Sequence, residues 1–173
     1  RKPAWINTHK FEDSLKSFFP EDSFEALSKK LFVTTTDITN GKSEIFHQGE
    51  LIKILMASSA YPVVFSPIEM NGVLYADGAI LNNFPVEPLQ GVTDKIIGVN
   101  VHRRKAINNK EMTSSYKIFR RAYEISAHYA YFRKYKYCDV VIAPDNLSRF
   151  STLRTNHADE IFQIGYDLSL IHI

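Results

Sequence analysis

The stretch L-Y-A-D-G-A-I-L-N-N-F-P-V, residues Leu74–Val86, holds an acidic residue between a short apolar run and a glycine. The residue types of Val73–Asp77 predict a strand that ends at Asp77. Asp-Gly followed by Asn-Asn is typical of a turn, so one interpretation of Asp77 is purely structural. The end of a strand is also where open α/β sheets bind their ligands. Taken by itself, the stretch allows both interpretations.

Strands and helices alternate on both sides of this stretch. We expect strands over Leu31–Ile38, 43–49, Val73–Asp77, Lys95–His102 and Cys138–Pro144. We expect helices from Phe11 to Pro20, then a short one capped by Asp22 or Ser23, then over Gly49–Ala60, Ser114–Tyr135 and from Asn156 or His157 to about Gly165. The alternation predicts an α/β fold with a partly parallel sheet. The chain has no internal repeat, which favours one domain.

Composition excludes several classes of protein. The 173 residues are 45% hydrophobic and carry a formal net charge of +2, which does not favour a dedicated nucleic-acid binder. The single cysteine, Cys138, excludes an internal disulfide and a cysteine-based zinc cluster. No run reaches the roughly eighteen apolar residues of a membrane span. Gly41-Lys42-Ser43 lacks the earlier glycine of a phosphate-binding loop, since Thr36 stands there, and is interpreted as a hairpin tip.

The six histidines show no spacing typical of metal ligands. They are His9, His47, His102, His128, His157 and His172. One of them could serve a Ser-His-Asp triad, but the pattern favours ordinary surface or structural roles and selects no candidate. Calcium-loop spacing is absent as well, so the sequence indicates no metal site.

The helix expected over 114–135 is basic and amphipathic. One stripe carries Lys117, Arg120, Arg121, Glu124 and His128, and another carries Ile118, Ala122, Ile125, Tyr129 and Phe132. Such a helix can contact anionic lipid head groups or an acidic partner. It can equally be a solvated outer face over a packing face, which is what amphipathic helices beside a sheet usually are.

Three motifs follow one another along the chain. They are Thr35-Thr36-Asp37 before a turn, Ala57-Ser58-Ser59-Ala60-Tyr61-Pro62-Val63-Val64-Phe65 at a helix end, and Tyr75-Ala76-Asp77-Gly78-Ala79 with Asn82-Asn83-Phe84-Pro85. In this order they resemble the patatin-like phospholipase family. The match covers roughly Phe24 to Val101, with a weaker echo in the last helix. The resemblance implies a three-layer α/β/α fold with a mostly parallel central sheet.

The resemblance also implies hydrolysis of lipid or phospholipid acyl esters by a Ser-Asp dyad without a cofactor. By position, Asp77 is the proton acceptor that activates the serine, and Gly78 and Ala79 complete the D-G-G/A motif. A carboxylate that contacts serine directly must be ionised, rigid and within hydrogen-bond reach. A small neighbour such as Gly78 leaves room for the serine loop. Ala79 replaces the commoner second glycine.

The serine itself is missing from the matched stretch. The family's nucleophile elbow, G-x-S-x-G, has only a partial counterpart in Gly41–Ile45, and the glycine-rich oxyanion loop has none. Because both precede the Asp in family members, we expect the chain to be N-terminally truncated and inactive alone. Residues 1–167 are interpreted as the C-terminal portion of one patatin-like domain, and Leu168–Ile173 as a non-native tail resembling translated adapter DNA.

Two hypotheses compete for the parent protein. The first is a bacterial serine lipid hydrolase, cytoplasmic or peripheral at the membrane. The second is a catalytically dead patatin-like module whose basic helix binds membranes or a partner. An intact upstream serine elbow favours the first and its loss favours the second. A histidine-triad hydrolase is a third interpretation, and the lipid specificity is left open.

Overall fold

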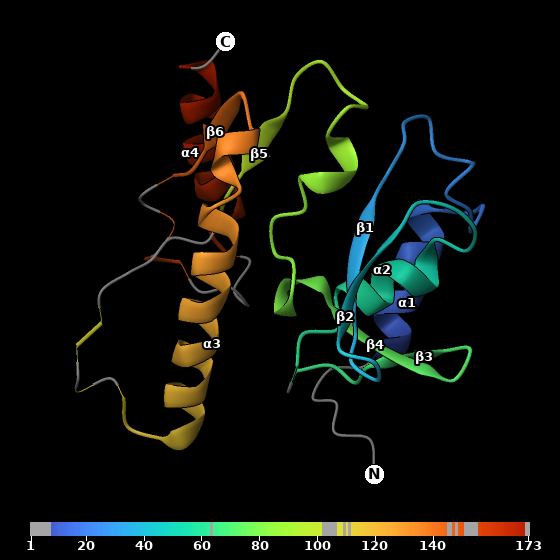
Figure 1. The fold of residues 1–173 in the computed structure, drawn as a ribbon, viewed down its shortest axis with the longest axis horizontal. Coiled ribbons are helices and arrows are strands. Elements are labelled where there is room, and N and C mark those ends of the chain that lie inside the picture. Colours follow the sequence, from blue (N-terminus) through green and yellow to red (C-terminus); the bar gives the residue numbers. More distant parts are fainter. Residues whose placement is uncertain are drawn as a thin grey trace. The chain divides into compact units, whose positions relative to one another are not determined.

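The computed structural model describes residues 8–62, 64–101, 107–108, 110, 112–144, 147, 149–150 and 156–171. The chain divides into two compact units, Arg1–Pro88 and Leu89–Ile173, and each is described by itself (Figure 1). The interpretation of residues 1–167 as a single domain stays a prediction.

The first unit is built on a four-stranded sheet with the order β2-β1-β4-β3. Its elements are α1 (Thr8–Phe18), β1 (Val33–Asp37), β2 (Lys42–Phe46), α2 (Ile52–Ser58), β3 (Ile68–Met70), β4 (Val73–Asp77) and the 3-10 turn η1 (Gly78–Ile80), followed by η2 (Glu87–Leu89) at the boundary of the units. Helix α2 packs on β1 and β4, and α1 packs on α2 (Figure 1). Helices and sheet together agree with the predicted α/β class.

The prediction of a mostly parallel central sheet is wrong for this sheet, because all three of its strand pairings are antiparallel. For the pairs β1–β2 and β3–β4 the physical reason is the length of the turns, since only antiparallel neighbours can be joined by a few residues. Strands β1 and β2 are joined by residues 38–41, and β3 and β4 by Asn71-Gly72. Both Asn71 and Gly72 have positive φ, 51° and 77°, which a type I′ hairpin turn requires.

The core of the first unit lies between the sheet and α2. All five residues of β1 are buried, and Phe24, Val33, Leu51 and Ile54 form a packed cluster. The sequence predicted that Asp22 or Ser23 caps a second short helix, and this prediction is wrong for Asp22. Its Oδ1 instead accepts hydrogen bonds from the backbone N–H groups of Leu51 and Ile52, at 2.9 and 2.6 Å, and so caps α2.

The second unit holds a two-stranded parallel sheet and two helices. Its elements are β5 (Ile97–Val99), α3 (Ser115–Phe132), the 3-10 turn η4 (Tyr135–Tyr137), β6 (Val140–Ile142) and α4 (Ala158–Leu170). Strands β5 and β6 pair in parallel, which is the only parallel pairing among the described strands. Helix α4 continues through Gly165 to Leu170, so the prediction that Gly165 ends it is wrong.

Strand β6 is half-buried, and much of α3 is exposed. Exposed apolar residues of α3 include Tyr116, Ile118, Phe119, Ile125 and Phe132. The side chains of Arg120, His128 and Tyr129, which belong to the predicted stripes, lie outside the described residues. Among the described helices, none combines the length and the apolar character needed to cross a bilayer.

Candidate active site

Asp77 is the last residue of β4 and the N-cap of the turn η1. Its carboxylate Oδ1 accepts a hydrogen bond from the backbone N–H of Ala79 at 2.9 Å. The backbone of Asp77 is extended, with φ −48° and ψ 129°, before the chain tightens into η1. The side chain is partly buried. The local hydrogen bond typical of an Asp-Gly turn is therefore present. It orients the Asp77 carboxylate through Ala79, two residues later in the chain.

The register of β1 against β4 leaves the backbone of Asp77 outside the ladder. Ile38 N–H donates to the Leu74 carbonyl, and hydrogen-bonded and non-hydrogen-bonded pairs alternate along an antiparallel ladder. Asp77 lies opposite Thr35, three positions along, at a non-hydrogen-bonded pair. Its N–H and C=O therefore need other partners.

Those partners come from two different elements. The N–H of Asp77 donates to the carbonyl of Ala60, just after α2, at 3.1 Å. The carbonyl of Asp77 accepts a hydrogen bond from the Thr36 hydroxyl of β1 at 2.9 Å. With the Ala79 bond, Asp77 is thus held at its N–H, its C=O and its carboxylate. This threefold attachment restricts the movement of the side chain relative to β1 and α2.

Gly78, the first residue of η1, lies directly against the backbone of β1. A Cβ at position 78 would lie 2.4 Å from the carbonyl oxygen of Thr34 and 2.7 Å from its carbonyl carbon. Both atoms belong to the backbone of a buried strand, which cannot move aside cheaply. Only glycine fits here, so the D-G motif is required by packing. Ala79, by contrast, contributes through its backbone N–H.

The small-residue end of α2 supports the same strand. The Ser58 hydroxyl donates to the Thr34 carbonyl at 2.8 Å, while Ser59 is exposed. Ala57 and Ala60 are buried against the sheet, which lets the helix end approach β1 and β4 closely. In the N-N-F-P tail, Phe84 is buried and anchors the chain after η1. Ser58 therefore serves β1 as a structural donor.

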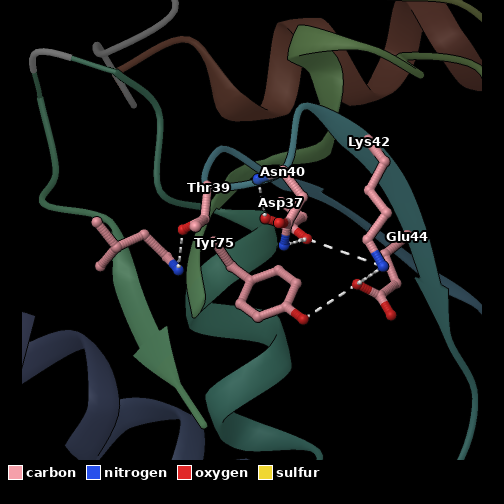
Figure 2. Close-up of polar contacts among 7 residues, drawn as sticks. Asp37, Thr39, Asn40, Lys42, Glu44 and Tyr75 are labelled. Carbon is pink, nitrogen blue, oxygen red and sulfur yellow. Dashed lines mark hydrogen bonds and ion pairs between the residues drawn. The ribbon is translucent and has the colours of Figure 1, made fainter. Parts of the chain in front are cut away.

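Asp37 ends β1 in a different environment, drawn in Figure 2. It is 1% exposed, and its two carboxylate oxygens accept hydrogen bonds from the backbone and side-chain N–H groups of Asn40, at 2.9 and 2.8 Å. Lys42 Nζ lies 3.9 Å from the Asp37 carboxylate and 3.7 Å from that of Glu44 (Figure 2). The Tyr75 hydroxyl donates to Glu44 at 3.0 Å.

These contacts set the ionisation of the hairpin residues. Burial alone would raise the pKa of Asp37, but the hydrogen bonds from Asn40 and the charge of Lys42 outweigh it and lower that pKa. Burial, followed by the bond to the Glu44 carboxylate, raises the pKa of Tyr75. Asp37 is therefore an ionised turn residue whose negative charge is stabilised by Asn40 and Lys42. The Gly41–Ser43 stretch lies at this hairpin turn, as the sequence predicted.

The contacts of His47 and His157 are of ordinary structural types. His47 packs edge-on against Phe32, and His157 Nδ1 lies 3.4 Å from Glu160. His102 and His172 lie outside the described residues, as does the side chain of His128. Within the described ranges, no group of three or more His, Cys, Asp or Glu side chains is arranged to hold a metal ion.

A family profile described as "Patatin-like phospholipase" matches residues 1–89 of this chain. The chain belongs to the patatin-like phospholipase family. The matched residues contain β1, α2 and β4 with Asp77, Gly78 and Ala79. The resemblance inferred from the three motifs is confirmed, and the site described above lies inside the family region.

Three relatives of this patatin-like chain differ in their names, in their identity to it and in the share of their length that it matches. An uncharacterized NTE family protein of Mycobacterium tuberculosis is 33% identical over 102 residues, which is 58% of this chain and 28% of that protein. A probable lipid hydrolase of Invertebrate iridescent virus 6 is 31% identical, over 49% of this chain and 28% of its own length. Lysophospholipase NTE1 of Cryptococcus neoformans var. neoformans is 28% identical, over 54% and 6%. The match thus spans under a third of each relative.

The structure assigns contacts to residues that the patatin-like motifs did not explain. Thr36 and Ser58 lie within the quoted motifs, but their donation to Asp77 and Thr34 depends on a strand register that spacing alone does not give. Strand β3 was not predicted, although Asn71-Gly72 is a strong hairpin signal. The catalytic role of Asp77 stays a prediction.

Proposed function

We propose that this chain is part of a lipid acyl-ester hydrolase in which Asp77 is the proton acceptor of a Ser-Asp dyad. The family is that of patatin-like phospholipases, and two of the relatives are named as a probable lipid hydrolase and a lysophospholipase. The serine and the oxyanion donors are proposed to come from sequence preceding Arg1. The 173 residues alone are then inactive.

The observation that carries this proposal is the threefold attachment of Asp77. A carboxylate that takes the proton directly from serine must keep one orientation. In a dyad no histidine lies between the carboxylate and the serine hydroxyl to transfer that proton. Bonds to the Asp77 N–H, C=O and Oδ1 hold the residue on a buried strand pair. Gly78 removes the side chain that would otherwise push β4 away from β1.

The proposed reaction needs no cofactor. The serine Oγ attacks the ester carbonyl carbon while its proton passes to the Asp77 carboxylate, and the carbonyl oxygen becomes an oxyanion. When that intermediate collapses, the alcohol leaves with the proton from Asp77 and an acyl-enzyme remains. Water then attacks the acyl-enzyme and gives a proton to Asp77. The fatty acid leaves and the serine recovers its proton.

The test is hydrolysis of p-nitrophenyl esters by the complete gene product, meaning the protein encoded by the full reading frame that contains this chain. Asp77→Asn keeps the shape of the side chain but removes the base. We expect kcat to fall by about 10⁴-fold with the fold retained, the size of loss seen when a triad carboxylate is removed. Wild-type activity in Asp77→Asn would return Asp77 to the turn-residue interpretation.

A second function is favoured by the surface of α3. Helix α3 exposes both a basic residue, Lys117, and large apolar residues such as Tyr116 and Phe119, and helices that contact lipid surfaces expose both kinds of residue. Under this alternative the protein is a catalytically inactive module, cytoplasmic or peripheral at a bacterial membrane. Lys117→Glu would then weaken cosedimentation with anionic vesicles, and Lys53→Glu, on exposed α2 surface, is the control. Loss of the upstream serine elbow would favour this alternative.

A further inference from the structure

Strand β1 carries three consecutive buried threonines whose hydroxyls have different surroundings. Thr34, Thr35 and Thr36 are 7%, 0% and 2% exposed. The Thr36 hydroxyl donates to the Asp77 carbonyl at 2.9 Å. The hydroxyls of Thr34 and Thr35 have no hydrogen-bond partner within the described part of the chain. A buried hydroxyl without a partner stabilises nothing, so the three residues differ in what their hydroxyls do.

The Thr36 bond completes what the strand ladder leaves open. Because Asp77 occupies a non-hydrogen-bonded pair opposite Thr35, its carbonyl receives no backbone donor from β1. The Thr36 side chain supplies that donor from the neighbouring position. The bond joins β1 to the residue immediately before Gly78, where the chain leaves the sheet. Without the bond, the Asp77 peptide can rotate at the point where β4 turns into η1.

We propose that Thr36 is a positioning residue for Asp77. This inference rests on the proposed function, because it matters only if Asp77 is the proton acceptor. The Thr36 hydroxyl acts through the Asp77 backbone and does not touch the reacting atoms. Removing it lets the carboxylate drift, and displacements of about 1 Å at a catalytic group can lower the rate up to about a hundred-fold.

The deciding variant is Thr36→Val in the complete gene product. Valine keeps the volume and branching of threonine and removes only the donor. We expect kcat for p-nitrophenyl ester hydrolysis to fall about ten- to a hundred-fold, while KM is unchanged, because substrate contacts are untouched. Thr36→Ser retains the hydroxyl and restores kcat. All assays are run at a temperature well below the midpoint of thermal unfolding of each variant.

Two matched controls separate positioning from general stability. Thr35→Val changes the neighbouring, equally buried threonine and removes a hydroxyl with no partner in the described structure. Thr39→Val removes a hydroxyl that also holds β4, since Thr39 Oγ1 accepts from the N–H of Leu74 at 3.0 Å, but at the other end of the strand. Both variants keep wild-type kcat. If Thr36→Val does not fold, Thr36→Cys, with a weaker donor, replaces it and shows a lowered kcat.

The outcomes separate this inference from the proposed function. A fall in kcat for Thr36→Val alone, reversed in Thr36→Ser, supports the inference. Wild-type kcat in Thr36→Val together with an inactive Asp77→Asn overturns the inference and leaves the dyad standing. An equal loss in Thr35→Val or Thr39→Val also overturns it, because any change along the strand pair would then suffice. An active Asp77→Asn overturns both.

Discussion

Asp37 and Asp77 each end a strand of the same antiparallel pair, and each is followed by a turn, yet their surroundings differ. Asp37 is 1% exposed, and Asn40 bonds to both of its carboxylate oxygens. Asp77 is partly buried and is held largely through its backbone. The carboxylate of Asp37 stabilises the local turn. Asp77 is held in place mainly by hydrogen bonds of its main chain.

Asp37 and Asp77 differ in how far they fit the turn-residue interpretation of a strand-ending aspartate. The β1–β2 hairpin is closed by Asp37, whose carboxylate accepts from the backbone N–H of Asn40 as turn-forming aspartates do. Asp77 also bonds a nearby N–H, but it lies where the motif of the family and the close approach of Gly78 coincide. We infer that the two ends of the β1–β4 pair have separate tasks, the hairpin end for stability and the Asp77 end for chemistry.

The largest effect is expected for Gly78→Ala. The new Cβ would lie 2.4 Å from the Thr34 carbonyl oxygen, so the strands must separate beside Asp77. We expect the free energy of unfolding to fall by about 3 kcal/mol, the upper range of overpacking costs, with loss of ester hydrolysis. Urea unfolding and the p-nitrophenyl assay measure the two effects.

Gly165→Ala is the control for that substitution. Gly165 lies inside α4, where an added Cβ meets nothing within 4 Å, so alanine should raise stability by up to about 1 kcal/mol. A Gly78→Ala variant as stable and active as wild type would show that β1 and β4 can separate without consequence. It would break the comparison at the Asp77 end.

The next effect concerns Asp37 and acid. Because its pKa is lowered in the folded protein, the native state binds this proton less readily than the unfolded chain does. The stabilisation is therefore complete above the unfolded pKa of about 3.9 and disappears as pH falls through the lower folded pKa. Asp37→Asn should be less stable than wild type at neutral pH, and the gap should close in acid.

Urea midpoints of wild type and Asp37→Asn, measured from pH 7 down to the acid limit of folding, test this prediction. Asp37→Asn should also retain its ester hydrolysis. A stability gap that is independent of pH would mean that the carboxylate charge of Asp37 does not matter to the hairpin.

The smallest effect is expected for Tyr75→Phe. The Tyr75 hydroxyl donates to Glu44 at 3.0 Å, and Tyr75 pairs with Asp37 across the ladder. Loss of one such bond should lower the free energy of unfolding by about 1 kcal/mol without changing kcat. Thermal unfolding gives the stability difference. A fall in kcat would show that the hairpin end influences the chemistry after all.

Much of the first unit could be predicted from local pattern. The strands β1, β2 and β4, the hairpin turn at Asn40-Gly41 and the helix before Pro62 follow from residue types and turn chemistry. Beyond this hairpin, the direction of the strands does not follow from the pattern, because alternating helices and strands predict parallel strands joined by crossover connections. The Asn71-Gly72 turn, which makes β3 and β4 antiparallel, carries the missing signal.

The residues proposed for the site follow from the sequence motifs, but their contacts do not. The spacing of motifs marked Asp77, Gly78 and Ala79, whereas the roles of Thr36 and Asp22 depend on which segments meet in space. Asp22 caps a helix that begins 30 positions later, and such a partner cannot be inferred from a local window. The sequence suggests that Gly78 leaves room for a serine loop. In the structure the atoms nearest to a Cβ at this position belong to the Thr34 backbone.

The most direct test of this account compares Asp77→Asn with Asp37→Asn in the complete gene product. Both variants replace a strand-ending carboxylate by its amide, and kcat for p-nitrophenyl ester hydrolysis and the urea midpoint are measured for each. The account predicts that Asp77→Asn loses activity and keeps its fold, while Asp37→Asn loses stability and keeps activity. Activity retained in Asp77→Asn, or lost in a folded Asp37→Asn, would contradict it.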